Sequence, residues 1–91
     1  MRLDKFLKVS RIIKRRTMAK EVAEQGRVQI NGQTAKAGAN VKVGDEVAIQ
    51  FGQKHVTFRI NRLEDSIRKE EAETMYTIVK EERIKEEGIL D

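Results

Sequence analysis

The stretch Gly26-Arg27-Val28-Gln29-Ile30-Asn31-Gly32 marks a change in the hydrophobic period of the chain. Before Gly26 the apolar residues recur at helical spacing, whereas after it they alternate with polar residues, as in a strand with one buried face. Gly26 is the residue type that commonly ends a helix. Asn31-Gly32 is a strong signal for a tight turn, because both turn positions need a positive φ. The stretch therefore predicts a helix that ends at Gly26 and a β-hairpin that turns at Asn31-Gly32.

Two short helices are predicted before this hairpin. Leu3, Phe6 and Leu7 lie at spacing i, i+3, i+4, which puts them on one face of a first helix. Residues 10–16 are expected to connect it to a second helix. Thr17 would cap that second helix, because its hydroxyl can accept a backbone N–H bond.

After the hairpin turn, the alternation predicts a small antiparallel sheet of short strands, including residues 33–35, 47–51 and 56–60. Helical spacing returns near the C-terminus, where Ala72, Met75, Tyr76 and Val79 follow an i, i+3, i+4, i+7 pattern. The predicted class is therefore α+β. Two short N-terminal helices pack on a small antiparallel sheet, and a C-terminal helix follows.

The charges are divided between the two ends of the chain. The net charge is +4, but residues 1–36 hold ten basic and three acidic side chains, whereas residues 63–91 hold five and ten. A basic front of this kind predicts a polyanionic partner. The chain has no cysteine, which excludes disulfides and thiolate zinc sites and fits a reducing cytoplasm. Its apolar runs are too short to span a membrane.

Nothing in the chain predicts an enzyme. The single histidine, His55, lies on a predicted strand, and the serines Ser10 and Ser66 have no base nearby in the sequence. The phosphate-loop and metal-ligand spacings are absent, and the glutamates near the C-terminus read as a solvated charge run. We therefore expect no catalytic residue, metal site, cofactor or small-molecule substrate.

The basic residues at the start of the chain are the candidate binding site. Arg2, Lys5 and Lys8 recur every three residues along one flank of the first helix, and the others lead into the N-terminus of the second helix, which attracts phosphate. A solvated face would interleave both signs of charge. The predicted RNA-binding residues are Arg2, Lys5, Lys8, Arg11, Lys14, Arg15, Arg16 and Lys20.

The aromatic residues indicate how RNA would be recognised. Phe6, Phe51, Phe58 and Tyr76 all fall on predicted apolar faces, so they are expected in the core. Proteins that bind single strands usually stack bases on exposed aromatic rings. Without such a platform, contact with duplex or folded RNA through its backbone and shape is expected.

Four blocks of the sequence resemble the α-L RNA-binding motif, the module named after ribosomal protein S-four. The resemblance spans residues 1–51 and implies RNA contact by Arg2, Lys5, Arg16 and Lys20. It also implies that Asp4 orients an arginine. The blocks are Arg2-Leu3-Asp4-Lys5-Phe6-Leu7, Arg16-x-x-Ala19, Gly26-x-Val28-x-Ile30-Asn31-Gly32 and Val43-Gly44-Asp45-Glu46-Val47.

Within that family the chain is similar to the heat-shock-protein-fifteen group. This resemblance implies a ribosome quality-control factor that binds the rRNA of stalled, split large ribosomal subunits together with peptidyl-tRNA. It further implies support of C-terminal alanine tailing by an RqcH-type tailing factor. Residues 1–62 would form the S-four-like domain, and residues 63–91 the C-terminal helix and a charged tail. The alternatives are an rRNA-binding ribosome assembly or translation accessory factor, an RNA-modifying enzyme and a DNA-binding protein.

Overall fold

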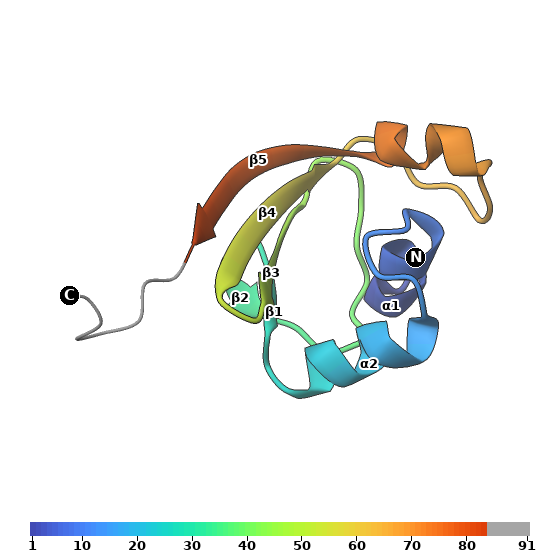
Figure 1. Cartoon of the computed structure of the whole chain (residues 1–91). Coiled ribbons are helices and arrows are strands. Elements are labelled where there is room, and N and C mark those ends of the chain that lie inside the picture. The colour runs from blue at the N-terminus through green and yellow to red at the C-terminus, as the bar shows by residue number, and fades with distance from the viewer. Residues whose placement is uncertain (84–91) are drawn as a thin grey trace, which may run out of the picture.

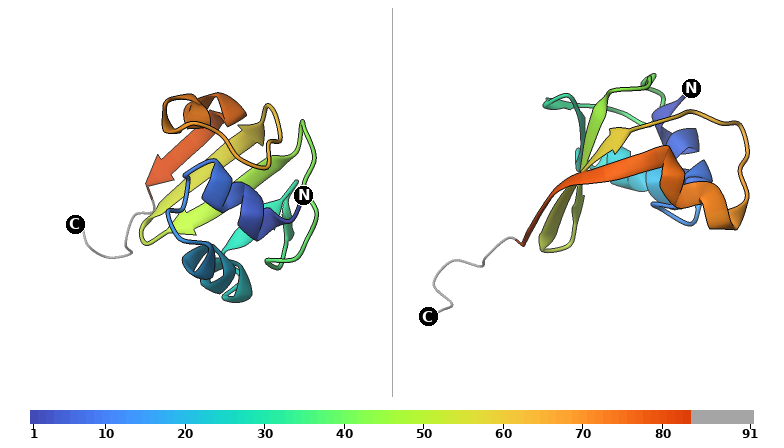
Figure 2. Two further views of the ribbon diagram at one scale, coloured as in Figure 1. Left: turned by 90° about the vertical axis from the view of Figure 1, so that its right-hand side faces the viewer. Right: turned by 90° about the horizontal axis from the view of Figure 1, so that it is seen from above.

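A computed structural model of the chain describes residues 1–83. Two α-helices lie on one side of an antiparallel sheet, with the C-terminal strand along one edge (Figures 1 and 2). This arrangement confirms the α+β class. The elements in chain order are α1 (Leu3–Val9), α2 (Arg16–Glu24), β1 (Val28–Ile30), β2 (Gln33–Thr34), β3 (Glu46–Phe51), β4 (Lys54–Ile60), the 3-10 helix η1 (Lys69–Met75) and β5 (Tyr76–Arg83).

The sheet is built outward from the predicted hairpin. Within residues 1–83 it has five antiparallel strands in the order β2-β1-β3-β4-β5. Asn31 and Gly32 have φ values of 51° and 87°, which is the left-handed conformation that a two-residue hairpin turn requires. Gly26, with φ of 76°, follows the end of α2. The hairpin and the helix stop are therefore confirmed.

The core lies between α1 and the sheet face toward which it packs. Leu3, Phe6 and Leu7, the predicted helical stripe, are completely buried. Val47 and Ile49 of β3 are also completely buried, and their neighbours in β3 are partly exposed. The alternation read from the sequence thus gives β3 and β4 one inward face each, and the helices pack against it.

The start of α2 differs from the prediction. The helix begins at Arg16, so Thr17 lies inside its first turn and makes no capping hydrogen bond. Arg15 occupies the cap position with an extended backbone and no side-chain cap. Arg16, the first residue of α2, is ion-paired to Asp4 of α1.

The predicted C-terminal helix is only partly correct. Ala72 and Met75 are buried as expected, but they lie in the short 3-10 helix η1, in which residues three apart share a face. From Tyr76 onward the chain is strand β5, so the prediction of a helix there is wrong. Residues 77–79 are all β-branched, which favours a strand. β5 also pairs along the whole of β4, whose backbone groups would otherwise be an open edge.

The segment after Ile60 therefore contributes a strand to the same sheet. The division into residues 1–62 and 63–91 stays a prediction, and the charged tail lies, from residue 84 onward, outside the described residues. Among residues 1–83, no helix is both long and apolar enough to cross a membrane.

Two isoleucines of the sheet test this placement of β5. Ile60 is 1% exposed and Ile78 is 52% exposed. We expect Ile60→Ala to lower the free energy of unfolding by about 2–5 kcal/mol, because it leaves a cavity in the core. Ile78→Ala should cost about 1 kcal/mol or less, because half of that side chain already faces solvent. Guanidinium denaturation of the two variants measures both values, and equal losses would contradict the structure.

Candidate nucleic-acid interface

A buried carboxylate joins the two helices that carry the predicted binding residues. The Asp4 side chain is 4% exposed and lies between two arginine side chains that are about half exposed, Arg2 at 52% and Arg16 at 49%. Arg2 donates from Nε to Oδ1 at 3.2 Å and from Nη2 to Oδ2 at 3.3 Å. Arg16 Nη2 donates to Oδ1 at 3.4 Å, and its Nε lies 3.3 Å from Oδ2. The expected role of Asp4 in orienting an arginine is thus confirmed, and it applies to two arginines.

The electrostatics of this cluster keep Asp4 charged. Burial alone would raise the pKa of the Asp4 carboxyl, because it disfavours the charged form. The hydrogen bonds and positive charges of Arg2 and Arg16 outweigh burial and hold that pKa below its ordinary value. The cluster therefore carries one negative and two positive charges, with its excess positive charge on the exposed arginines.

The segment around Gly38 supports Arg2 from the other side. Leu3 N–H donates to the Ala39 carbonyl at 2.7 Å, and Asp4 N–H donates to the Ala37 carbonyl at 3.1 Å. These bonds satisfy two of the free N–H groups at the start of α1. A Cβ on Gly38 would lie 3.6 Å from Arg2 Nη2, so this loop passes directly beside the guanidinium group. The sequence indicated only a loop at residues 36–40, and nothing in it predicts this contact.

The remaining predicted residues fall into two groups. Lys5 is paired with Asp65, at 2.9 Å between Nζ and Oδ1, which ties α1 to the segment before η1. The others have exposed side chains that make no ion pair or hydrogen bond with any side chain or backbone group of residues 1–83. They are Lys8, Arg11, Lys14, Arg15 and Lys20.

These five unpaired cations are spread over the helices and their connection. Lys8 and Arg11 line one shallow hollow, which also contains Asp65. Lys20 lies on a side of α2 that carries Glu21 and Glu24, so its surroundings are less positive than the sequence suggested. The structure therefore brings Arg2 and Arg16 together and places Lys8 beside Arg11. Lys20 lies on a surface of mixed charge.

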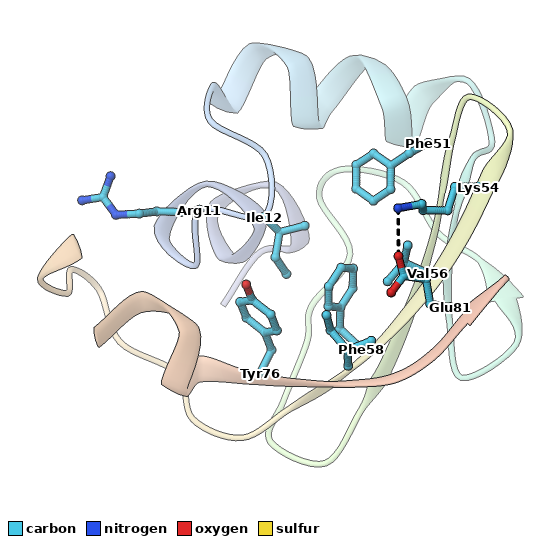
Figure 3. Close-up of a pocket in the computed structure, with 9 residues that line it drawn as sticks. Arg11, Ile12, Phe51, Lys54, Val56, Phe58, Tyr76 and Glu81 are labelled. Atoms are coloured by element: carbon cyan, nitrogen blue, oxygen red, sulfur yellow. Dashed lines mark ion pairs between the residues drawn. The ribbon is translucent and has the colours of Figure 1, made fainter. Parts of the chain in front are cut away.

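The connection between the helices holds Arg11 in an unusual backbone conformation. Arg11 has φ of 64°, a left-handed conformation that costs a residue other than glycine about 1–2 kcal/mol. Ile13, only 5% exposed, anchors the connection in the core, and its N–H donates to the Leu7 carbonyl at 3.1 Å. Burial of Ile13 offsets this cost, and the Arg11 side chain extends away from the body of the protein (Figure 3).

A second buried carboxylate fixes the hairpin. Asp45 is 5% exposed and accepts hydrogen bonds from the Asn31 side chain at 3.1 Å and from Lys42 N–H at 3.0 Å. The Asn31 side chain also accepts from Glu46 N–H at 3.0 Å. Burial opposes the charged form of Asp45, but these bonds and the charge of Lys42 hold its pKa below the ordinary value. The Asn-Gly and Gly-Asp blocks are therefore structural partners across the sheet.

Two aromatic residues pack against the core but are less buried than the sequence predicted. Phe6 and Phe58 are buried as predicted, but Phe51 and Tyr76 are only partly buried and line an open pocket. Phe51 stands at the end of β3 and Tyr76 at the start of the edge strand β5. Alternation gives the correct side of the sheet for Phe51, but it cannot show where the helices stop covering that side. No group of three or more histidine or acidic side chains within residues 1–83 could hold a metal ion.

The pH dependence of stability tests the Asp4 cluster. Because its folded-state pKa is lowered, Asp4 contributes stability that is complete above about pH 5 and is lost as the pH falls through that pKa. We expect Asp4→Asn to lower the free energy of unfolding by about 1–3 kcal/mol near neutral pH. The difference from the unsubstituted protein should shrink toward about pH 2.

Glu70→Gln is the matched control, because Glu70 is exposed and its side chain forms no hydrogen bond or ion pair with any of residues 1–83. Its unfolding free energy should follow that of the unsubstituted protein at every pH. A difference between Asp4→Asn and the unsubstituted protein that stays constant with pH would contradict the assigned pairing.

Comparison with known proteins identifies the family. The S4 domain model matches residues 1–47. The chain is 65% identical over 86 residues to "RQC P-site tRNA stabilizing factor" of Bacillus subtilis, covering 94% of this chain and 100% of that protein. The protein of the same name from Streptococcus pneumoniae is 54% identical, covering 94% of this chain and 98% of that protein. The structure of Heat Shock Protein 15 from Vibrio cholerae superposes with a TM-score of 0.80 at 34% identity, covering 86% of this chain and 80% of that one. The chain belongs to the S4-domain family and, within it, to the group of RQC P-site tRNA stabilizing factors.

Proposed function

We propose that this protein is a non-catalytic RNA-binding factor of ribosome quality control that acts in the cytoplasm. It would hold tRNA on the large ribosomal subunit by contacting the backbones of rRNA and tRNA. The observation that carries the proposal is the pair of half-exposed arginines, Arg2 and Arg16, which one buried carboxylate holds at the junction of the two helices.

The geometry of these arginines suits phosphate binding. An arginine has five N–H donors, and Arg2 and Arg16 each direct only Nε and Nη2 toward Asp4. The other N–H groups of each guanidinium stay available to an anion. Because Asp4 already restricts both side chains, binding a phosphate costs less side-chain entropy than it would for a free arginine.

The unpaired cations would add contacts that do not depend on sequence. Lys8, Arg11, Lys14 and Arg15 lie on α1 and the following connection, and none is neutralised by a described residue. Each cation that meets a phosphate releases counterions, so the affinity should fall steeply with salt. This mode of binding follows the backbone and shape of folded RNA.

The relatives' names supply the more specific part of the proposal. They carry the words "P-site tRNA stabilizing factor", and the identities of 54–65% extend over almost the whole chain. By analogy, this chain would bind peptidyl-tRNA on large subunits that remain after a stalled ribosome has split. It would thereby support alanine tailing by an RqcH-type factor. The chain's own part would be to bind and position, with no chemical step.

Arg16 is the sharpest single test of this surface. We expect Arg16→Ala to weaken binding to large ribosomal subunits that carry peptidyl-tRNA by roughly tenfold, because the variant loses a charge-assisted contact. The affinity of Arg16→Lys should lie between those of Arg16→Ala and the unsubstituted protein, since lysine keeps the charge but lacks the planar fork of donors. Co-sedimentation at several salt concentrations measures these affinities.

Arg59→Ala is the matched control for Arg16→Ala. Arg59 is an exposed arginine of β4, on the strand positions that alternate with the buried Phe58 and Ile60. The Arg59→Ala variant should bind large subunits that carry peptidyl-tRNA with the same affinity as the unsubstituted protein. Unchanged binding by Arg16→Ala would contradict the assigned surface. Equal binding to subunits with and without tRNA would favour the ribosome-assembly role instead.

The connection between the helices gives a separate prediction. The double variant Lys14→Ala, Arg15→Ala removes two exposed cations that have no described partner. Its slope of log affinity against log salt should be shallower by about 1–2 than that of the unsubstituted protein. Titration of labelled protein with large subunits at four or more salt concentrations measures the slope. An unchanged slope would remove these residues from the RNA contact.

A further inference from the structure

An open pocket lies next to the basic helices. Its volume is about 380 Å³, and its walls come from the α1–α2 connection and from β3, β4 and β5. Ile12 faces it from the connection, and the inward side chains of the sheet form the opposite wall (Figure 3). This size falls within the range of small-ligand pockets in proteins.

The pocket offers aromatic surface together with one polar group. Phe58 and Tyr76 pack edge to face with their ring centroids 5.1 Å apart, and Phe51 adds a third ring. The Tyr76 hydroxyl points toward Ile12 and makes no hydrogen bond with any group of residues 1–83 (Figure 3). The Tyr76 hydroxyl is therefore free to bond a ligand in the pocket.

Positive charge lines the mouth of the pocket. Arg11 contributes to its wall, and the guanidinium group of Arg11 extends outward, exposed and unpaired among the described residues. At the other end, the one acidic lining residue, Glu81, is paired with Lys54 at 2.8 Å. No unpaired acidic side chain lines the pocket to repel a phosphate.

Arg11 also belongs to the group of unpaired cations proposed above to meet RNA. Its neighbour across a shallow hollow is Lys8. The pocket is therefore continuous with the basic surface through a single residue.

We infer that this pocket receives an unpaired nucleobase of the RNA whose backbone the basic residues bind. The base would lie against Phe51 and Tyr76 and bond the Tyr76 hydroxyl, while the adjoining phosphate meets Arg11. Unpaired bases in folded RNA are commonly recognised by stacking on aromatic side chains and by hydrogen bonds to their edges. This inference rests on the proposed function, because it needs RNA on the basic surface.

The charge arrangement favours RNA over a peptide as the occupant. An apolar peptide side chain would use the walls but would leave the Tyr76 hydroxyl without a partner and would make no use of Arg11. A nucleotide satisfies all three features, with its ring in the pocket, a polar edge at the hydroxyl and its phosphate at the guanidinium.

Two RNA hairpins that differ by one nucleotide test the inference. One has a fully paired stem, and the other carries a single bulged 2-aminopurine, whose fluorescence reports unstacking and burial. The unsubstituted protein should bind the bulged hairpin at least about fivefold more tightly than the paired one, as expected for one stacked base. Binding should also change the 2-aminopurine fluorescence.

Adjacent residues of β5 supply the variant and its control. Ile78 and Val79 are 52% and 42% exposed, but of the two only Ile78 lines the pocket. Ile78→Ser should weaken the preference for the bulged hairpin, because it puts a hydroxyl into the apolar wall of the pocket, and Val79→Ser should keep the preference. Tyr76→Phe, which retains the ring, should reduce the preference about threefold by removing one hydrogen bond.

The outcomes separate this inference from the proposed function. Equal affinity of the unsubstituted protein for the two hairpins, or equal behaviour of Ile78→Ser and Val79→Ser, would overturn the nucleobase pocket. Affinity for the paired hairpin that is lost in Arg16→Ala would still support the proposed function in that case. A photo-crosslinking amino acid in place of Ile78, used on large subunits with peptidyl-tRNA, should crosslink to RNA. Crosslinks to protein alone would show that the pocket holds a peptide and would overturn the inference.

Discussion

A buried carboxylate cannot stay charged without partners, and Asp4 of α1 has one partner just before its own helix and another at the start of α2. Arg2 precedes it in the chain, whereas Arg16 lies at the start of the second helix. The carboxylate therefore sets the approach of α1 to α2. The backbone bond from Asp4 N–H to the Ala37 carbonyl adds the loop after the hairpin. Removing one partner of such a pair leaves a poorly solvated charge, so the helices and the loop are held as one unit.

The same cluster relates stability to binding. Asp4 neutralises one of the two positive charges beside it and restricts both side chains, yet half of each arginine remains exposed. The hairpin uses a second buried carboxylate differently. Asp45 is satisfied mainly by Asn31 and a backbone N–H, which makes it a structural lock. The two buried aspartates thus have different roles. Asp4 orients two arginines, and Asp45 holds together the strands that support the helices.

Much of this arrangement could be predicted from local sequence. The stripe of Leu3, Phe6 and Leu7 predicted α1, and Asn31-Gly32 predicted the turn, because each signal depends only on residues close in the chain. Thr17 was wrongly expected to cap α2, since the helix begins one residue earlier, at Arg16, which pairs with Asp4 of α1. The extension of the C-terminal helix beyond Met75 was also wrong, because the open edge of β4 recruits the following residues as a strand.

By itself, the sequence determined the helical and alternating periods, the position of the hairpin and the concentration of positive charge at the front of the chain. These features depend on side-chain size, backbone preference and charge, which neighbouring residues express locally. Only the tertiary structure decided that Asp4 serves two arginines, that Lys5 is tied to Asp65, and that Phe51 and Tyr76 line a pocket. Each of these contacts depends on which distant segments of the chain come together. Burial and geometry in the folded protein determine that, and no local sequence pattern contains this information.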